Sequence, residues 1–185
     1  MKWLLRSNAA QIALVILLVA LAAVARLVPH PANFAPVMAV AIFGGAQLPR
    51  RWAVIVPVVA MAASDLIIGV YDWRIMFTVW ACYGITAYVS SRWLRRLSVA
   101  RGAVLTLAAS CFFFVVTNFA VWAAGGMYAH TWQGLASCYY FALPFFRNTL
   151  LSDAAYTVLL FGLWRLAGLA AGTGAVRAAD VAHKA

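Results

Sequence analysis

The chain has 185 residues, of which 66% are hydrophobic and only 10% are charged, and its formal net charge at pH 7 is +10. A soluble domain of this size cannot bury so much apolar surface, so the composition indicates an integral membrane protein. The basic residues lie between apolar runs, where they act as topology signals and do not form a phosphate-binding face, so we expect no nucleic-acid partner.

Six apolar segments are predicted to cross the membrane, because each approaches the roughly 20 residues that a spanning helix needs. They are residues 8–28, 34–49, 52–71, 75–91, 102–125 and 147–169. We interpret the first as a span and not as a cleaved signal peptide, because its uncharged run from Ser7 to Ala25 exceeds the usual apolar core of about 7–15 residues. The second is the weakest span, since it is short and contains paired glycines that let another backbone approach closely.

Residues 126–146 are too polar and too aromatic for a helix that faces lipid on all sides. They are typical of a capping or re-entrant segment at the membrane surface. We therefore expect an all-α membrane protein, a bundle of six transmembrane helices with an extracytoplasmic cap. Residues 1–172 form its single domain, and the small and polar residues 173–185 form a disordered cytoplasmic tail.

The distribution of basic residues predicts the orientation of the bundle. With the N-terminus in the cytoplasm, eleven of the fourteen lysines and arginines fall on the cytoplasmic side. Only Arg26, Arg74 and Arg147 then remain outside, which is a clear positive-inside bias. Both termini are therefore expected in the cytoplasm.

Two aspartates, Asp65 and Asp153, lie inside apolar spans, and each is preceded by a serine. An intramembrane carboxylate is costly, so it normally faces the bundle interior or a water-filled cavity and finds a partner there. Either residue could be a substrate contact or a proton site. Either could equally be structural, paired with Arg147 or with a helix N-terminus.

Polar and aromatic side chains gather in the segments that this orientation places outside. A belt of aromatic residues at the membrane surface explains part of this enrichment, but it explains the amides, the histidines and Arg147 less well. Apolar walls with a few placed polar groups are the usual composition of a ligand pocket. The candidate substrate-binding residues are His30, Asn33, Asn118, Trp122, Tyr128, Arg147 and Asn148.

Cys82 lies in the middle of an uncharged run, residues 77–88, while Cys111 and Cys138 lie in packed or aromatic surroundings. The three cysteines lack the CxxC and Cys/His spacing of a disulfide framework or a structural zinc site. A buried thiol is more often a small hydrophobe than a reactive group. If a ligand carried a metal into the bundle, however, Cys82 would be a soft sulfur donor in a dry site.

Three stretches resemble a known group of membrane proteins: HPANFAPVMAVAIFGGA (30–46), SDLIIG (64–69) and, most specifically, residues 117–162. They are similar to the small six-span proteins related to the substrate-binding (S) components of energy-coupling factor (ECF) vitamin transporters. The match covers roughly residues 26–163. A cysteine in the fourth span resembles the BtuM-like branch of solitary S components, which is implicated in cobalamin uptake and in which the cysteine can be an axial ligand of cobalt.

The resemblance implies that Cys82 is a ligand of the cobalt of a corrinoid. A second hypothesis makes the protein a membrane enzyme that acts on its ligand, because thiolate attack at cobalt could displace an upper axial ligand such as cyanide. It also implies that the substrate lies near His30, Asn33, Asp65, Arg147 and Asn148. Cobalamin is then the bound substrate, with no other cofactor, and the protein belongs in the inner membrane of a bacterium. An ECF coupling module, made of ATPases and a transmembrane subunit, is the partner that the resemblance suggests, unless the protein acts alone.

We therefore expect the capture and membrane passage of cobalamin (vitamin B12) or a related corrinoid. An alternative is an uptake protein for another vitamin or a lipid-like molecule, in which Cys82 only packs. A structural membrane subunit without a substrate also stays open. The chain has no P-loop, kinase, HExxH or GxSxG motif, so energy for transport would come from a partner or from a gradient.

Overall fold

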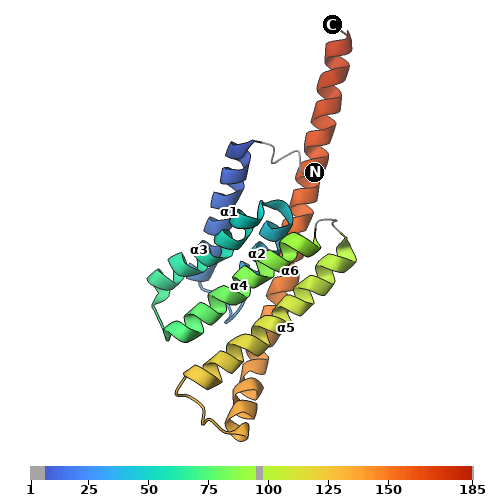
Figure 1. The fold of residues 1–185 in the computed structure, drawn as a ribbon. Coiled ribbons are helices and arrows are strands. Elements are labelled where there is room, and N and C mark those ends of the chain that lie inside the picture. The colour runs from blue at the N-terminus through green and yellow to red at the C-terminus, as the bar shows by residue number, and fades with distance from the viewer. Residues whose placement is uncertain (1–6, 95–97, 185) are drawn as a thin grey trace.

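The computed structural model describes residues 7–94 and 98–184, which form six α-helices and no strand (Figure 1). This confirms the all-α fold class. The helices are α1 (Asn8–Leu27), α2 (Val37–Gln47), α3 (Arg50–Ile68), α4 (Trp73–Trp93), α5 (Val99–Ala124) and α6 (Trp132–Lys184).

Four helices of the described chain are long and apolar enough to cross a membrane, namely α1, α3, α5 and the part of α6 from Trp132 to Ala170. These helices indicate a membrane protein with transmembrane helices. Helix α4 has 21 residues, whereas α2 is a shorter apolar helix of 11 residues. At 1.5 Å per residue, α2 is about 17 Å long, well short of the ~30 Å hydrocarbon core.

The helix ends follow from local sequence signals. Ser7 caps α1 by accepting a hydrogen bond from the backbone N–H of Ala10, and Asp72 caps α4 in the same way through Arg74. Such caps satisfy backbone donors that have no partner within the helix. Gly69 ends α3 with a φ of 127°, a backbone angle that residues with a Cβ rarely adopt.

Helix α2 lies at the centre of the bundle and contacts all five other helices (Figure 1). Ten of its eleven residues are buried. A helix that is apolar on every side is either buried among other elements or in contact with lipid, and the VMAVAIFGGAQ sequence of α2 has this character. Its closest approach is to α4, where the backbone of Gly45 meets Ala87 and Ser90.

The segment 126–146, predicted to be a cap, does not form an element of its own. A loop of residues 125–131 leads into α6, and residues 132–146 are the first part of that helix, which continues through Pro144. Aromatic and small polar residues are compatible with a helix that is partly exposed, which is why composition alone did not reveal the continuity. The backbone of α6 also stays helical through residues 173–184, where the sequence predicts a disordered tail.

The contact between α2 and α4 predicts different effects for two neighbouring glycines. A Cβ on Gly45 would lie 2.5 Å from Ser90 Cβ and 2.6 Å from the carbonyl oxygen of Ala87, whereas a Cβ on Gly44 would meet its nearest atom at 3.8 Å. Gly45→Ala should therefore destabilise the protein by about 1–3 kcal/mol through overpacking. Gly44→Ala should be neutral or should stabilise the helix by about 0.5–1 kcal/mol.

Thermal unfolding of both variants in detergent, followed by size-exclusion fluorescence, measures the difference. Equal melting temperatures for Gly45→Ala and Gly44→Ala would contradict the close packing of α2 against α4.

Candidate functional site

A buried ion pair joins the ends of α1 and α3. Arg26 Nη2 lies 2.7 Å from Asp65 Oδ1, and Asp65 is only 2% exposed. Trp80 of α4 donates from Nε1 to the other carboxylate oxygen at 2.8 Å. Arg26 also donates to the hydroxyl of Ser64 and, at 3.4 Å, to the carbonyl oxygen of Met61. Both oxygens of Asp65 are therefore occupied by protein donors.

This network changes the interpretation of Asp65, for which the sequence suggested a substrate contact or a pair with Arg147. The partner is Arg26, which sequence reasoning placed outside but did not connect to Asp65. Because α1 and α3 run in the same direction and each ends near its charged residue, the pairing of Arg26 with Asp65 could have been recognised from span positions. The role of Trp80 has no such signal, since it depends on the rotation of α4.

The loop between α1 and α2 is held on α6. Asn148 Nδ2 donates to the carbonyl oxygen of Ala32 at 3.0 Å, and Ser152 Oγ donates to that of Ala35 at 3.1 Å. His30 and Asn33 are both exposed in this loop, and Asn33 adopts a φ of 60°. The structure therefore brings three predicted residues, His30, Asn33 and Asn148, to one region, where the amide of Asn148 fixes the loop.

A second group of predicted residues surrounds the loop between α5 and α6. Trp122 Nε1 donates to the carbonyl oxygen of Ala129 at 3.0 Å, and its ring centroid lies 5.6 Å from that of His130. Asn118 bonds back to the carbonyl oxygen of Phe114 within α5, at 2.8 Å. Tyr128 is half-buried in the loop itself.

The predicted residues thus form two groups and not one pocket. Trp132, at the start of α6, and Asn148 are sixteen residues apart, which corresponds to about 24 Å along the helix. Arg147 is exposed, and within residues 7–94 and 98–184 no ion pair holds it. Their roles in substrate binding stay predictions.

Cys82 is a free thiol, 1% exposed, near the middle of α4. Thr86 and Ser90 follow it at four-residue intervals and are also buried, so the three side chains share one face of the helix. Ser90 on this face donates to the carbonyl oxygen of Ile42 in α2 at 2.6 Å. The buried face of α4 that carries Cys82 therefore reaches α2 at Ser90, two turns further along the helix.

The three cysteines differ in their surroundings. Cys138 is buried and its sulfur donates to the carbonyl oxygen of Asn118 at 3.4 Å, whereas Cys111 is exposed. Within the described residues no hydrogen bond engages the sulfur of Cys82, and no group of three or more His, Cys, Asp or Glu side chains could hold a metal ion. Cys82 could thus supply only one ligand to a metal ion, and the other ligands would have to come from the molecule that carries the metal.

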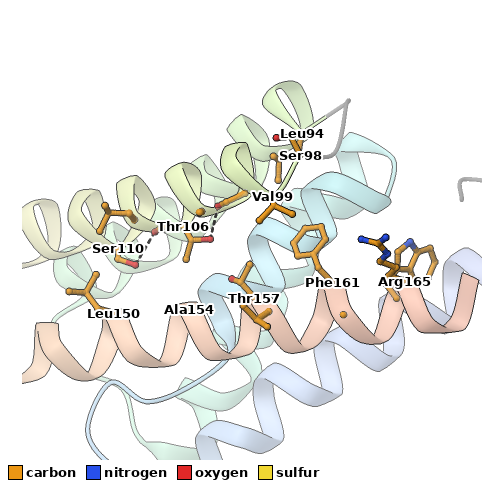
Figure 2. Close-up of a pocket in the computed structure, with 16 residues that line it drawn as sticks. Leu94, Ser98, Val99, Thr106, Ser110, Leu150, Ala154, Thr157, Phe161 and Arg165 are labelled. Carbon is orange, nitrogen blue, oxygen red and sulfur yellow. Dashed lines mark hydrogen bonds between the residues drawn. The ribbon is translucent and has the colours of Figure 1, made fainter. Parts of the chain in front are cut away.

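A cavity of about 680 Å³ lies between the first half of α5 and the middle of α6, residues 150–165. Ser98 and Arg165 lie at one end and Ser110 and Leu150 at the other (Figure 2). The walls are mostly apolar, and the volume falls in the usual range of small-molecule pockets. None of the substrate-binding residues predicted from the sequence lines this cavity.

Two side chains of the cavity wall have buried polar atoms without a hydrogen-bond partner. They are Thr157, whose Oγ1 is free and whose side chain is 9% exposed, and Trp164, whose Nε1–H is free. Both lie on α6, seven residues apart and so on the same face of the helix. A molecule with hydrogen-bond acceptors could pair with them there, because an unpaired buried donor is costly.

The pair between Arg26 and Asp65 predicts a large loss of stability when one partner is removed. Asp65→Asn leaves the Arg26 guanidinium buried without a counter-charge, so it should cost about 3–5 kcal/mol and lower the yield of folded protein. Asp72→Asn is the matched control, because Asp72 and Arg74 form an exposed ion pair. Hydrogen bonds from the Arg74 side chain lower the pKa of Asp72 to about 2, yet solvent screens this pair and its loss should change the melting temperature little.

A double substitution, Arg26→Leu with Asp65→Leu, should be more stable than either single substitution, since no unpaired charge remains. Melting temperatures and folded yields in detergent measure all five variants, which are Asp65→Asn, Asp72→Asn, the two single leucine substitutions and the double substitution. An Asp65→Asn protein with unchanged yield and melting temperature would show that the pair does not hold α1 to α3.

A model for a family described as "Family of unknown function (DUF6580)" matches residues 6–174. Neither a curated protein nor a solved structure matches. Since the match covers most of the chain, the protein belongs to the DUF6580 family.

Proposed function

We propose that this protein binds cobalamin or a related corrinoid in the membrane and takes it up, with the Cys82 thiolate as an axial ligand of cobalt. One observation carries the choice of residue. Of the two buried cysteines, Cys138 is hydrogen-bonded to Asn118, while the sulfur of Cys82 has no hydrogen bond in the described chain. A soft thiolate in a dry site suits a metal centre, and metal binding would itself remove the thiol proton.

Binding at Cys82 requires α4 and α2 to separate. Cys82 lies on the face of α4 that carries Thr86 and Ser90, and Ser90 is in tight contact with Gly45 of α2. A corrin ring is far wider than the space left by such a contact. Helix α2 is short and hydrogen-bonds to α4 through Ser90 alone among the described side chains, so a shift of α2 is the movement that we propose for ligand entry.

Ligand exchange at cobalt would follow from the same geometry. The thiol of Cys82 loses its proton and donates a sulfur electron pair to cobalt. The upper ligand, for example cyanide, leaves with the electron pair of its bond and takes up the proton, so the oxidation state of cobalt does not change. Uptake and removal of the upper ligand would then occur at one residue, with or without an ECF coupling module as partner.

We propose a bacterial inner-membrane protein with six spans, both termini in the cytoplasm, and residues 126–146 on the outer side. The support is the positive-inside bias. Five arginines lie towards one end of the described bundle, namely Arg50 and Arg51 at the start of α3, Arg92 in the last turn of α4, Arg101 at the start of α5, and Arg165, which lines the same cavity as Ser98. The opposite end holds Arg26, Arg74 and Arg147, of which the first two are paired with aspartates.

A second candidate function, uptake of another small molecule with Cys82 as a packing residue, is favoured by the cavity between α5 and α6. That cavity does not include Cys82, whereas it does include the unpaired polar atoms of Thr157 and Trp164. The ligand would be a largely apolar molecule with hydrogen-bond acceptors.

The orientation predicts which loops are accessible from outside the cell. Alkaline phosphatase, which is active only outside the cytoplasm, should be active when it is fused at Met127, in the loop between α5 and α6. Fused at Ser98, before α5, alkaline phosphatase should be inactive, whereas a fluorescent protein that folds in the cytoplasm should fluoresce at that position. Opposite results at the two positions would contradict the proposed orientation and place residues 126–146 on the cytoplasmic side.

Substitution of each cysteine tests the cobalt ligand. Cys82→Ser should preserve the fold, because serine is similar in size and its hydroxyl can bond to a carbonyl of its own helix. It should shift or abolish the absorption spectrum of bound cobalamin and stop the release of cyanide, because a hydroxyl is a much harder ligand than a thiolate.

Cys111→Ser and Cys138→Ser are the matched controls and should leave the spectrum unchanged. If Cys82→Ser binds cobalamin with the wild-type spectrum, the thiol is not the cobalt ligand. If the wild-type protein does not bind cobalamin at all, the second candidate function replaces the first.

A further inference from the structure

Asp153 is a buried carboxyl group that the proposed cobalt chemistry does not use. It lies on α6, is 2% exposed, and its Oδ2 is 2.6 Å from Ser110 Oγ of α5. No ion pair reaches it from the described arginines, lysines or histidines. Helix α2, the other helix packed beside this part of α6, has no titratable side chain, and Tyr83 of α4 is the neighbouring titratable group.

The hydroxyl of Ser110 lies between two acceptors but has only one proton. Its oxygen is 2.6 Å from Asp153 Oδ2 and 3.0 Å from the carbonyl oxygen of Thr106, one turn earlier in α5. If Ser110 donates to that carbonyl, as helical serines commonly do, then Asp153 must donate a proton of its own to the serine oxygen. The bond would run from Asp153 to Ser110 and on to Thr106.

The other arrangement leaves an ionised Asp153 with one neutral donor. A carboxylate taken out of water needs a counter-charge or several donors, and otherwise it takes up a proton. Asp65 illustrates the alternative, since it receives hydrogen bonds from Arg26 and from Trp80. Asp65 thus has a guanidinium and an indole N–H as partners, whereas Asp153 has a single neutral hydroxyl.

The cavity between α5 and α6 reaches Ser110, the partner of Asp153. Ser110 and Thr106 line the cavity between α5 and α6, and Figure 2 shows their hydroxyl groups along α5, opposite Ala154 and Thr157 of α6. Ser110, the hydrogen-bond partner of Asp153, and Ala154, the next residue of α6, therefore both face the cavity. A proton that enters at the end near Ser98 and Arg165 meets the hydroxyl of Ser110 before it meets the carboxyl group.

We propose that Asp153 is a proton-binding site that exchanges its proton with the cavity through Ser110. The proposal does not depend on the corrinoid proposal. Because the bound proton forms part of the contact between α5 and α6, opening of that contact and loss of the proton are thermodynamically linked. A proton gradient would then act on the α5–α6 pair.

Infrared spectroscopy tests the proton directly, because the chain has only four acidic side chains, all aspartates. The protein in dodecyl maltoside, a detergent without carbonyl groups, should show at pH 7 the carbonyl band of a protonated carboxyl group. Asp153→Asn should remove this band, and Asp72→Asn, which changes an exposed carboxylate, should retain it. Ser110→Ala should keep the band and move it to higher frequency, because the hydrogen bond is lost.

Absence of the band from the wild type at pH 7, or its survival in Asp153→Asn, would overturn the proposal. The route is tested by the rate at which the band shifts after transfer to D₂O. Ala154→Phe fills the cavity and should slow this exchange several-fold, whereas Leu163→Phe, on an exposed part of α6, should not.

Gly162→Phe is a second cavity-filling variant in case Ala154→Phe fails to fold, since a Cβ on Gly162 would meet no atom within 4 Å. Wild-type exchange in a folded cavity-filled protein would show that the proton does not pass through the cavity.

Discussion

The whole arrangement depends on the burial of α2, an eleven-residue helix that is shorter than the four candidate spans and too apolar to face water. Burying it requires contacts with all five other helices, and these contacts fix the rotation of each. Gly45 brings the backbone of α2 onto Ser90 of α4, and Phe43 packs its ring against Phe161 and Trp164 of α6. The faces of α4 and α6 that point inward, and hence the positions of Cys82 and Asp153, follow from this packing.

The helices around α2 are held together in two different ways. Helices α1, α3 and α4 are joined by charge, through Arg26, Asp65 and Trp80, and removal of one partner would leave a buried charge. Helices α5 and α6 are joined across part of their length by a hydrogen bond between Ser110 and Asp153, beside a cavity. The α5–α6 contact beside the cavity is therefore held without a charge pair, and its opening and the proposed shift of α2 would both leave the α1–α3–α4 network in place.

Most of the fold could be predicted from the sequence, because hydropathy reports helices directly. Each predicted span corresponds to one helix, and α1, predicted as residues 8–28, is observed as Asn8–Leu27. The start of the last helix was placed too late, at residue 147 instead of Trp132, because aromatic and polar residues in a half-exposed helix have the same composition as a surface cap. The boundary depended on packing, which composition does not record.

The candidate site could be predicted less well. The burial of Cys82 was expected from its uncharged surroundings, but its position on the buried face of α4 that reaches α2 at Ser90 depends on helix rotation. Asp65 was recognised as a costly charge, while its partner Arg26 was not. The cavity could not be predicted from the sequence. It arises where small residues such as Gly102, Ala103 and Ala154 leave space between two helices, and hydropathy does not report that volume.

The central claim is that a sulfur atom of this chain binds the cobalt of a corrinoid inside the bundle. X-ray absorption at the cobalt edge of the purified protein loaded with cobalamin observes the atoms around the metal directly. The account predicts a sulfur scatterer in the first coordination shell, in addition to the four corrin nitrogens, and its absence from the Cys82→Ser protein. A shell of nitrogen, carbon and oxygen alone in the loaded wild-type protein would contradict it.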